Sequence, residues 1–152
     1  MKTLGIKRTN FKRLKLDFNM IIEDISMGAY KKSPVYHGPN VIVQSEVIEF
    51  HSALRIPHLY CVEYVDKVSG EIIEYFYDWE GRGEVFMKFH AHYHPPGTPA
   101  EITKYDPFHL HRREHPDDKQ AKLREKDITY QSLFNVLVHI KDMVYMNSHL
   151  SK

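Results

Sequence analysis

Residues 58–94 read HLYCVEYVDKVSGEIIEYFYDWEGRGEVFMKFHAHYH, and this stretch decides the fold. It contains three runs rich in β-branched and aromatic residues, HLYCVEYVD, EIIEYFYDW and EVFMKFHAHYH, which is typical of β-strands. Only the turn segments KVSG and EGRG separate them, and connections this short join antiparallel strands, not parallel ones. The stretch therefore predicts an antiparallel β-meander.

The segments around this meander predict an α+β fold. VIVQSEVIEF (41–50) should be a further strand, reached through a loop over 31–40, whereas 16–26 mixes helical and strand periods. Near the C-terminus, Thr129 can cap an amphipathic helix that packs one face on the sheet. Its apolar residues recur at helical spacing: Leu133, Val136, Leu137, Ile140 and Val144. The charged stretch 115–127 before this helix is expected to be exposed.

The composition fits one globular domain spanning residues 1–152. Hydrophobic residues make up 42% and charged residues 27% of the chain, which are ordinary values. The single cysteine, Cys61, lies in an apolar run and is expected to be a core thiol, which fits a reducing compartment. No apolar run approaches the roughly 20 residues that span a bilayer, and we find no secretory signal. We therefore expect a cytoplasmic protein without a membrane partner.

Basic residues are concentrated near the N-terminus, where no acidic residue occurs before Asp17. They are Lys2, Lys7, Arg8, Lys12, Arg13 and Lys15. Such a strip can face phosphate, but a solvated terminal arm is the simpler interpretation, because little aromatic interleaving supports base stacking. Residues 1–40 are therefore treated as a basic N-terminal extension of uncertain structure.

Histidines alternate with apolar residues in the last run of the meander. Successive side chains of a strand point to opposite faces, so Lys88, His90, His92 and His94 should share the face opposite an apolar row. The apolar row contains Val85, Met87, Phe89, Ala91 and Tyr93. Histidines packed in the core would share the apolar parity, so we expect them on the other face of the sheet.

A second histidine pair follows in FHLHRR (108–113). His109 and His111 alternate with apolar residues, and Arg112 and Arg113 come directly after them. The intervening chain is long enough to loop back and lay this segment beside the first. In that arrangement as many as five imidazoles would converge on one surface, together with lysine and arginine. Asp78, with Glu74, has the parity to point toward the same face and orient an imidazole.

Two kinds of chemistry use such a surface, and a third interpretation is a polar sheet face without chemistry. Neutral imidazoles bind zinc and other transition metals, and His-x-His on a strand places two ligands on one side. Paired histidines beside a cation can instead act as general acid and base in cleaving a phosphodiester. Nucleotide-binding glycine motifs, HExxH, CxxC and GxSxG are absent from the sequence, which removes support for the common enzyme classes.

The segments YFYDWEGR, FHAHYH and DPFHLHRRE, with the terminal helix, resemble the TumE family of toxin-antitoxin toxins over roughly residues 58–145. The resemblance implies a small cytoplasmic prokaryotic protein, encoded with an antitoxin partner, whose toxicity acts on RNA or translation. His90, His94, His109 and His111 match the family's histidine signature, and His92 is an additional candidate. The N-terminal 50 residues are longer than in compact members. Such an extension could hold the antitoxin or form the surface of a homodimer. It could also mark a branch of the family that has lost its toxicity.

These observations give three functional hypotheses. The first is a ribonuclease-type toxin with His90, His94, His109 and His111 as catalytic groups. Its phosphate-binding residues would be Lys88, Arg112 and Arg113. The second is a domain that binds zinc or another transition metal through His90, His92, His94, His109 and His111. The third is a non-enzymatic interaction module whose histidines make a protein interface sensitive to pH.

Overall fold

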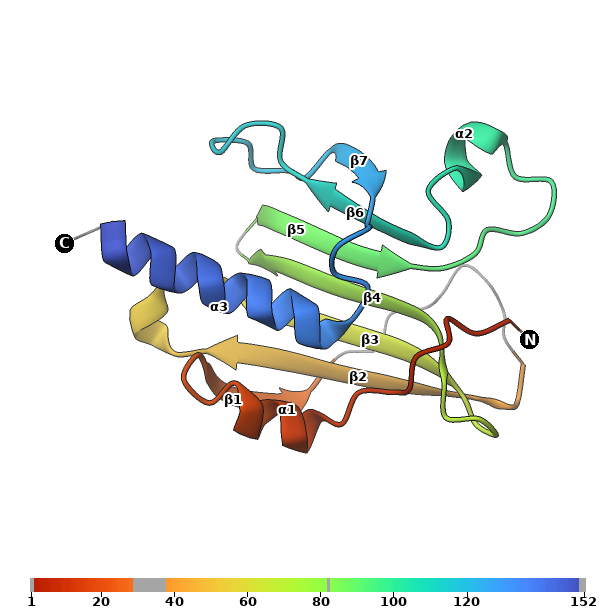
Figure 1. Ribbon diagram of the computed structural model, residues 1–152, viewed down its shortest axis with the longest axis horizontal. Helices are drawn as coiled ribbons and strands as arrows, with labels where there is room; N and C mark the ends of the chain where they lie inside the picture. The colour runs from red at the N-terminus through yellow and green to blue at the C-terminus, as the bar shows by residue number, and fades with distance from the viewer. Residues whose placement is uncertain (1, 29–37, 82, 151–152) are drawn as a thin grey trace.

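The computed structural model describes residues 2–28, 38–81 and 83–150, and it contains one antiparallel sheet of seven strands (Figure 1). The strands lie side by side in chain order, so the sheet is a single meander, as predicted. They are β1 (Ile22–Met27), β2 (Val41–Phe50), β3 (Leu59–Asp66), β4 (Ile72–Gly81), β5 (Glu84–Ala91), β6 (Phe108–Arg112) and β7 (Leu123–Lys126).

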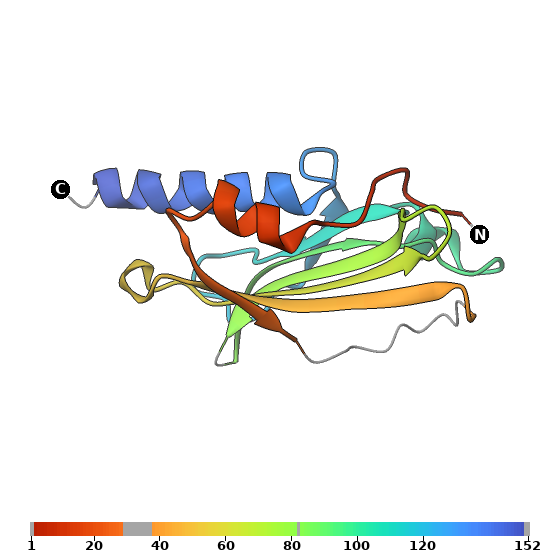
Figure 2. The same ribbon diagram turned by 90° about the horizontal axis from the view of Figure 1, so that it is seen from below.

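The two longer helices cover one face of this sheet. Figure 2 shows α1 (Phe11–Asp17) and α3 (Leu133–Leu150) on the same side, with neither of them under the other face. The short helices η1 (Ser52–Leu54) and α2 (Ala100–Thr103) lie in connections. Among the described residues, no helix combines the length and apolar character needed to cross a bilayer.

The apolar rows predicted for β4 and α3 form the core. Tyr75, Tyr77 and Trp79 are buried on the helix-bearing face, where Tyr75 and Tyr77 stack with ring centroids 4.2 Å apart. The predicted apolar residues of α3 are all buried in the same core cluster. The N-cap prediction for α3 was wrong, because Ser132 rather than Thr129 accepts a hydrogen bond, at 3.2 Å, from the Asn135 backbone N–H. The helix therefore begins three residues later than the sequence suggested.

The N-terminal segment is part of the fold. The Leu4 backbone N–H donates to the Ile72 carbonyl at 2.8 Å, and the Thr9 backbone N–H donates to the buried carboxyl group of Glu63 at 2.9 Å. The Tyr77 hydroxyl donates to the same carboxyl group at 2.5 Å, which ties this segment to the centre of the sheet. The ambiguous stretch 16–26 contains the end of α1 and most of β1. The loop expected over 31–40 lies largely outside the described residues.

The sheet extends beyond the predicted meander. Leu123–Lys126, within the stretch expected to be exposed and charged, forms the edge strand β7 and pairs with β6. Charged residues are common on edge strands because they oppose pairing with another chain, so this strand carries little apolar signal in the sequence. It places Arg124 opposite His111 and Lys126 opposite His109.

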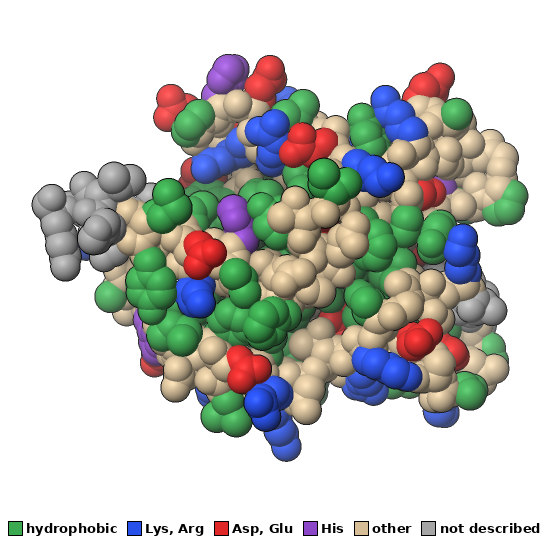
Figure 3. Space-filling view, in the orientation of Figure 1, with side chains coloured by type: hydrophobic (Ala, Val, Ile, Leu, Met, Phe, Trp, Pro, Cys, Tyr) green, Lys and Arg blue, Asp and Glu red, His purple; other side chains and the backbone are tan. Residues whose placement is uncertain are grey.

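The helix-bearing side carries exposed apolar residues, as the space-filling view shows (Figure 3). Leu16 of α1 and Phe134 of α3 are 72% and 51% exposed. Histidine side chains are sparse on this side. The histidines of β5 and β6 belong to the other face, which Phe76 and Asp78 of β4 share with them.

Candidate metal centre

The two histidine segments pair with each other, the arrangement that the length of the intervening chain allows. β5 and β6 are antiparallel neighbours, with His90 opposite His109 and Lys88 opposite His111. Residues directly opposite each other point to the same face of a sheet. The apolar residues Phe89 and Leu110 form the intervening pair and are buried on the helix-bearing face. Hydrophobic alternation thus sets the register that brings the histidines together.

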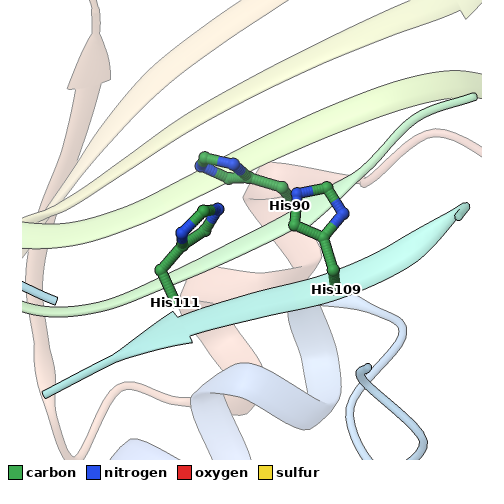
Figure 4. A group of neighbouring side chains, drawn as sticks. All are labelled: His90, His109 and His111. Atoms are coloured by element: carbon green, nitrogen blue, oxygen red, sulfur yellow. The ribbon is translucent and has the colours of Figure 1, made fainter. Parts of the chain in front are cut away.

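Three of these imidazoles form a compact group. His90, His109 and His111 each offer a nitrogen, and these nitrogens all lie within 4.8 Å of one another. Figure 4 shows the three rings leaving β5 and β6 and gathering above the pair of strands. The ring centroid of His90 lies 5.6 Å from that of His109 and 5.2 Å from that of His111. The group can hold a metal ion, because imidazole is a common ligand for transition metals.

A buried carboxylate orients one member of the group. His90 Nε2 lies 2.7 Å from Asp78 Oδ1, and the Asp78 side chain is 5% exposed. This contact is the one that the predicted role of Asp78, orienting an imidazole, requires. A ligand histidine commonly donates its second N–H to a carboxylate, which fixes the ring and makes the other nitrogen a better ligand. With Nε2 donating to Asp78, Nδ1 of His90 is the nitrogen that remains for a metal.

Burial holds the other two imidazoles in the neutral form. Desolvation, followed by the charges of His90 and other nearby cations, lowers the pKa of His109 to about 2 and that of His111 to about 4. Both rings are therefore neutral at pH 7, and a neutral imidazole is the form that binds metal. His109 is only 1% exposed, and its Nδ1 has no hydrogen-bond partner among the described residues.

The remaining two histidines extend the row beyond the group. The ring of His92 is 5.0 Å from that of His109 and 4.6 Å from that of His94. Desolvation, with the charges of His94 and His90, lowers the pKa of His92 to about 4. His94 Nδ1 lies 2.7 Å from Asp106 Oδ1, and its backbone N–H donates to Asp106 Oδ2 at 2.9 Å. All five predicted histidines thus form one continuous row, although only three make up the compact group.

The predicted phosphate-binding residues are divided between the two faces. Lys88 lies beside the histidines, 3.8 Å from Glu80. Arg112 is separated from them, since it follows His111 in the strand and donates from Nε to Glu125 at 2.6 Å. Its placement therefore does not support the expected phosphate contact.

Arg113 lies further along, toward the β4–β5 hairpin. Its guanidinium group is 4.5 Å from the centre of the Phe86 ring, and its Nη1 is 3.3 Å from Glu84 Oε1. Phe86 lies at a β-bulge of β5, where the pairing with β4 shifts by one residue, and its ring is 5.1 Å from that of Trp79. Arg113 therefore lies at the hairpin end of the sheet, apart from the three-histidine group.

Sequence reasoning missed Arg124 and Asp106. Arg124 is the register partner of His111, and its positive charge helps to lower the pKa of His92, His109 and His111. Its Nε is buried without a hydrogen-bond partner among the described residues. The signal for Arg124 would have been the alternation in LREK, had that segment been recognised as a strand. The proline-rich loop gave no comparable signal for Asp106.

Comparison with known proteins found no family, no curated protein and no solved structure that matches this chain. The resemblance to the TumE family therefore rests on the quoted residues alone. The local geometry of the three-histidine group is the firmest basis for inferring function.

Proposed function

We propose that the protein binds a transition metal ion, of the zinc class, through His90, His109 and His111, and uses it in a hydrolytic reaction. The observation that carries the proposal is the convergence of three ring nitrogens within 4.8 Å on neighbouring strands. Two of these rings come from β6 and one from β5, so sheet pairing rather than a flexible loop positions them. Zinc is commonly bound by nitrogen ligands about 2.0–2.1 Å away, so a small inward movement of the rings would complete the site.

The donor groups fit such an ion. His109 and His111 are neutral at pH 7, so binding does not have to displace protons from them. Asp78 contacts the ring of His90 on the side away from the metal-binding nitrogen, as a carboxylate usually does beside a ligand histidine. His109 is buried, and its Nδ1 has no hydrogen-bond partner among the described residues. Leaving a buried ring nitrogen without a partner costs free energy, and coordination of a metal ion would provide a partner for this ring.

Three protein ligands leave one position open for water or substrate, as in catalytic rather than structural zinc sites. Bound by these three residues, a zinc ion would supply an activated water as the nucleophile at neutral pH. Lys88 and Arg124 flank the histidines on neighbouring strands and favour an anionic substrate. These features support hydrolysis of a negatively charged ester as the proposed reaction.

Cobalt(II) provides the direct test of the coordination geometry, because it replaces zinc and reports a four-coordinate site by strong visible absorption. We expect that absorption from the natural protein and its loss in His111→Ala. The matched control is His115→Ala, since His115 is exposed in the β6–β7 connection. The absence of four-coordinate bands from the natural protein would overturn the proposed site.

A second candidate is action on RNA as a toxin, which the TumE resemblance implies. The observation that favours it is a group of cations around the histidines, with Lys88 and Arg124 opposite His111 and Lys126 opposite His109. Positively charged strips follow nucleic acid backbones. On this proposal the antitoxin would be a protein partner, and a metal-bound site could itself perform the cleavage.

Inducible expression in a bacterial host tests this second candidate. We expect growth arrest with RNA fragmentation from the natural protein, and relief of both in the His109→Ala/His111→Ala double variant. Because His109 is buried, circular dichroism must show that the variant is folded, and His111→Gln provides a milder replacement. Normal growth with the natural protein, or undiminished arrest with a folded double variant, would contradict this proposal.

A further inference from the structure

A second concave site lies on the histidine side of the sheet, near the β4–β5 hairpin. It is a cleft of about 630 Å³ between the segment that precedes β3 and the ends of β4 and β5. Figure 2 shows the hairpin curving away from α1 and α3, with the η1 loop at the same end of the sheet. The cleft lining includes Arg55, Pro57, His58, Tyr60, Glu80 and Phe86. Its volume is in the range of small-molecule sites.

The cleft is continuous with the three-histidine group through the strand register. Tyr60 is directly opposite Asp78, the residue that contacts His90. Asp78 is in turn opposite Lys88, and Lys88 is opposite His111, so the row that begins at Tyr60 runs across β3, β4, β5 and β6 on the histidine face. Neighbouring strands lie about 4.8 Å apart, so the row from Tyr60 to His111 spans about 14 Å. A ligand with one end in the cleft and the other at the histidines would therefore extend about 14 Å and pass over Lys88.

The cleft offers flat apolar surfaces and hydrogen-bond acceptors. Tyr60, His58 and Phe86 are partly buried aromatic rings, and aromatic rings in a concave site stack with planar ligands. Glu80 and Glu84 provide carboxylates, and the contacts of Glu80 with Lys88 and of Glu84 with Arg113 each involve one oxygen. A carboxylate has capacity for several hydrogen bonds, so both can accept from a ligand amino group.

We propose that this cleft binds a nucleobase that carries an exocyclic amino group, as part of a nucleotide whose phosphate lies over Lys88 toward the histidines. The location of the phosphate rests on the proposed function, whereas base binding rests on the cleft alone. Glutamate accepts a hydrogen bond from the cytosine amino group, but it faces a carbonyl oxygen at the same position of uracil. The cleft therefore discriminates by the amino group.

Cytidine and uridine monophosphate form a matched pair for the test, because both carry the same sugar and phosphate. Isothermal titration should show cytidine monophosphate binding about tenfold more tightly than uridine monophosphate, within the range for a specific base contact. Trp79, the only tryptophan, gives a second readout, because its ring is 5.1 Å from Phe86 and its Nε1 donates to the Pro57 carbonyl. Its fluorescence should change as the cleft fills.

Two variants assign the discrimination to the cleft. The double variant Glu80→Gln/Glu84→Gln should reduce the preference for cytidine to within about twofold, because an amide offers both a donor and an acceptor. Tyr60→Leu should weaken both nucleotides by removing a stacking surface. Glu114→Gln, an exposed residue outside the cleft, should leave both affinities unchanged.

Metal-free protein separates this inference from the proposed metal site. Cytidine preference in metal-free protein and in His111→Ala supports the cleft even if no zinc binds. Equal affinities for the two nucleotides, no detectable binding of either, or a preference that persists in Glu80→Gln/Glu84→Gln would overturn the inference while leaving zinc binding unaffected.

Discussion

Saturating zinc should raise the melting temperature of the natural protein by about 10 °C. A ligand present at 1,000 times its dissociation constant stabilises the folded state by about 4 kcal/mol, and each kcal/mol corresponds to about 2–4 °C for a domain of this size. The three-histidine group exists only in the folded chain, because its members come from two strands whose histidines are separated by a long connection. Differential scanning calorimetry of tag-free protein, with and without zinc, measures this shift.

Variants of single histidines locate the stabilisation. His111→Ala removes one ligand and should reduce the zinc-induced shift to less than about 3 °C, because the remaining two imidazoles bind more weakly. Asp78→Asn should weaken zinc binding by about 10- to 100-fold, the usual effect of removing a carboxylate behind a ligand histidine. His115→Ala should behave like the natural protein. An unchanged shift in His111→Ala would place zinc elsewhere on the chain.

Acid should destabilise the metal-free protein by about 3 kcal/mol between pH 7 and pH 5. The pKa values of His92, His109 and His111 are lowered in the folded state, so the unfolded chain binds more protons as the pH falls below about 6.5. Stability is therefore fully present above that pH and decreases below it. Each group could contribute about 2 kcal/mol at pH 5, but partial exposure of His92 and His111 reduces the sum.

Urea denaturation at several pH values measures this effect. His111→Gln should flatten the dependence by about a third, because glutamine does not titrate. His51 acts in the opposite direction: its pKa is raised by the Asn19 carbonyl and by Glu23, so its contribution is lost as the pH rises. His51→Gln should therefore steepen the loss of stability in acid. A free energy of unfolding that does not fall between pH 7 and pH 5 would contradict the assignment of three neutral histidines.

The sequence predicted the sheet where its pattern was regular. The run from 58 to 94 combines strand propensity with short turns, and the meander follows. Alternation in FHAHYH and FHLHRR likewise predicted which face the histidines share, because strand parity needs no knowledge of distant residues. β7 was missed because LREK has the composition of an exposed loop, and its pairing is visible only in the folded sheet.

Several features of the site depend on contacts that form only in the folded chain and not on the sequence pattern of the strands. Strand parity predicted that Asp78 and the histidines share a face of the sheet. Parity does not predict how closely neighbouring side chains pack on that face, so it could not predict that His109 is almost fully buried. Arg124 reaches the site through the β6–β7 pairing and Asp106 through a loop. For the same reason Arg112, adjacent to His111 in sequence, faces away from it and pairs with Glu125.

Elemental analysis of tag-free protein, purified without chelators and dialysed against zinc, tests the metal centre most directly. The proposed site predicts one zinc per chain for the natural protein and for His115→Ala. It predicts less than about a tenth of that for a folded His90→Ala/His111→Ala variant, since one remaining imidazole cannot hold the ion. No bound zinc or other transition metal in the natural protein, or full occupancy in the double variant, would contradict it.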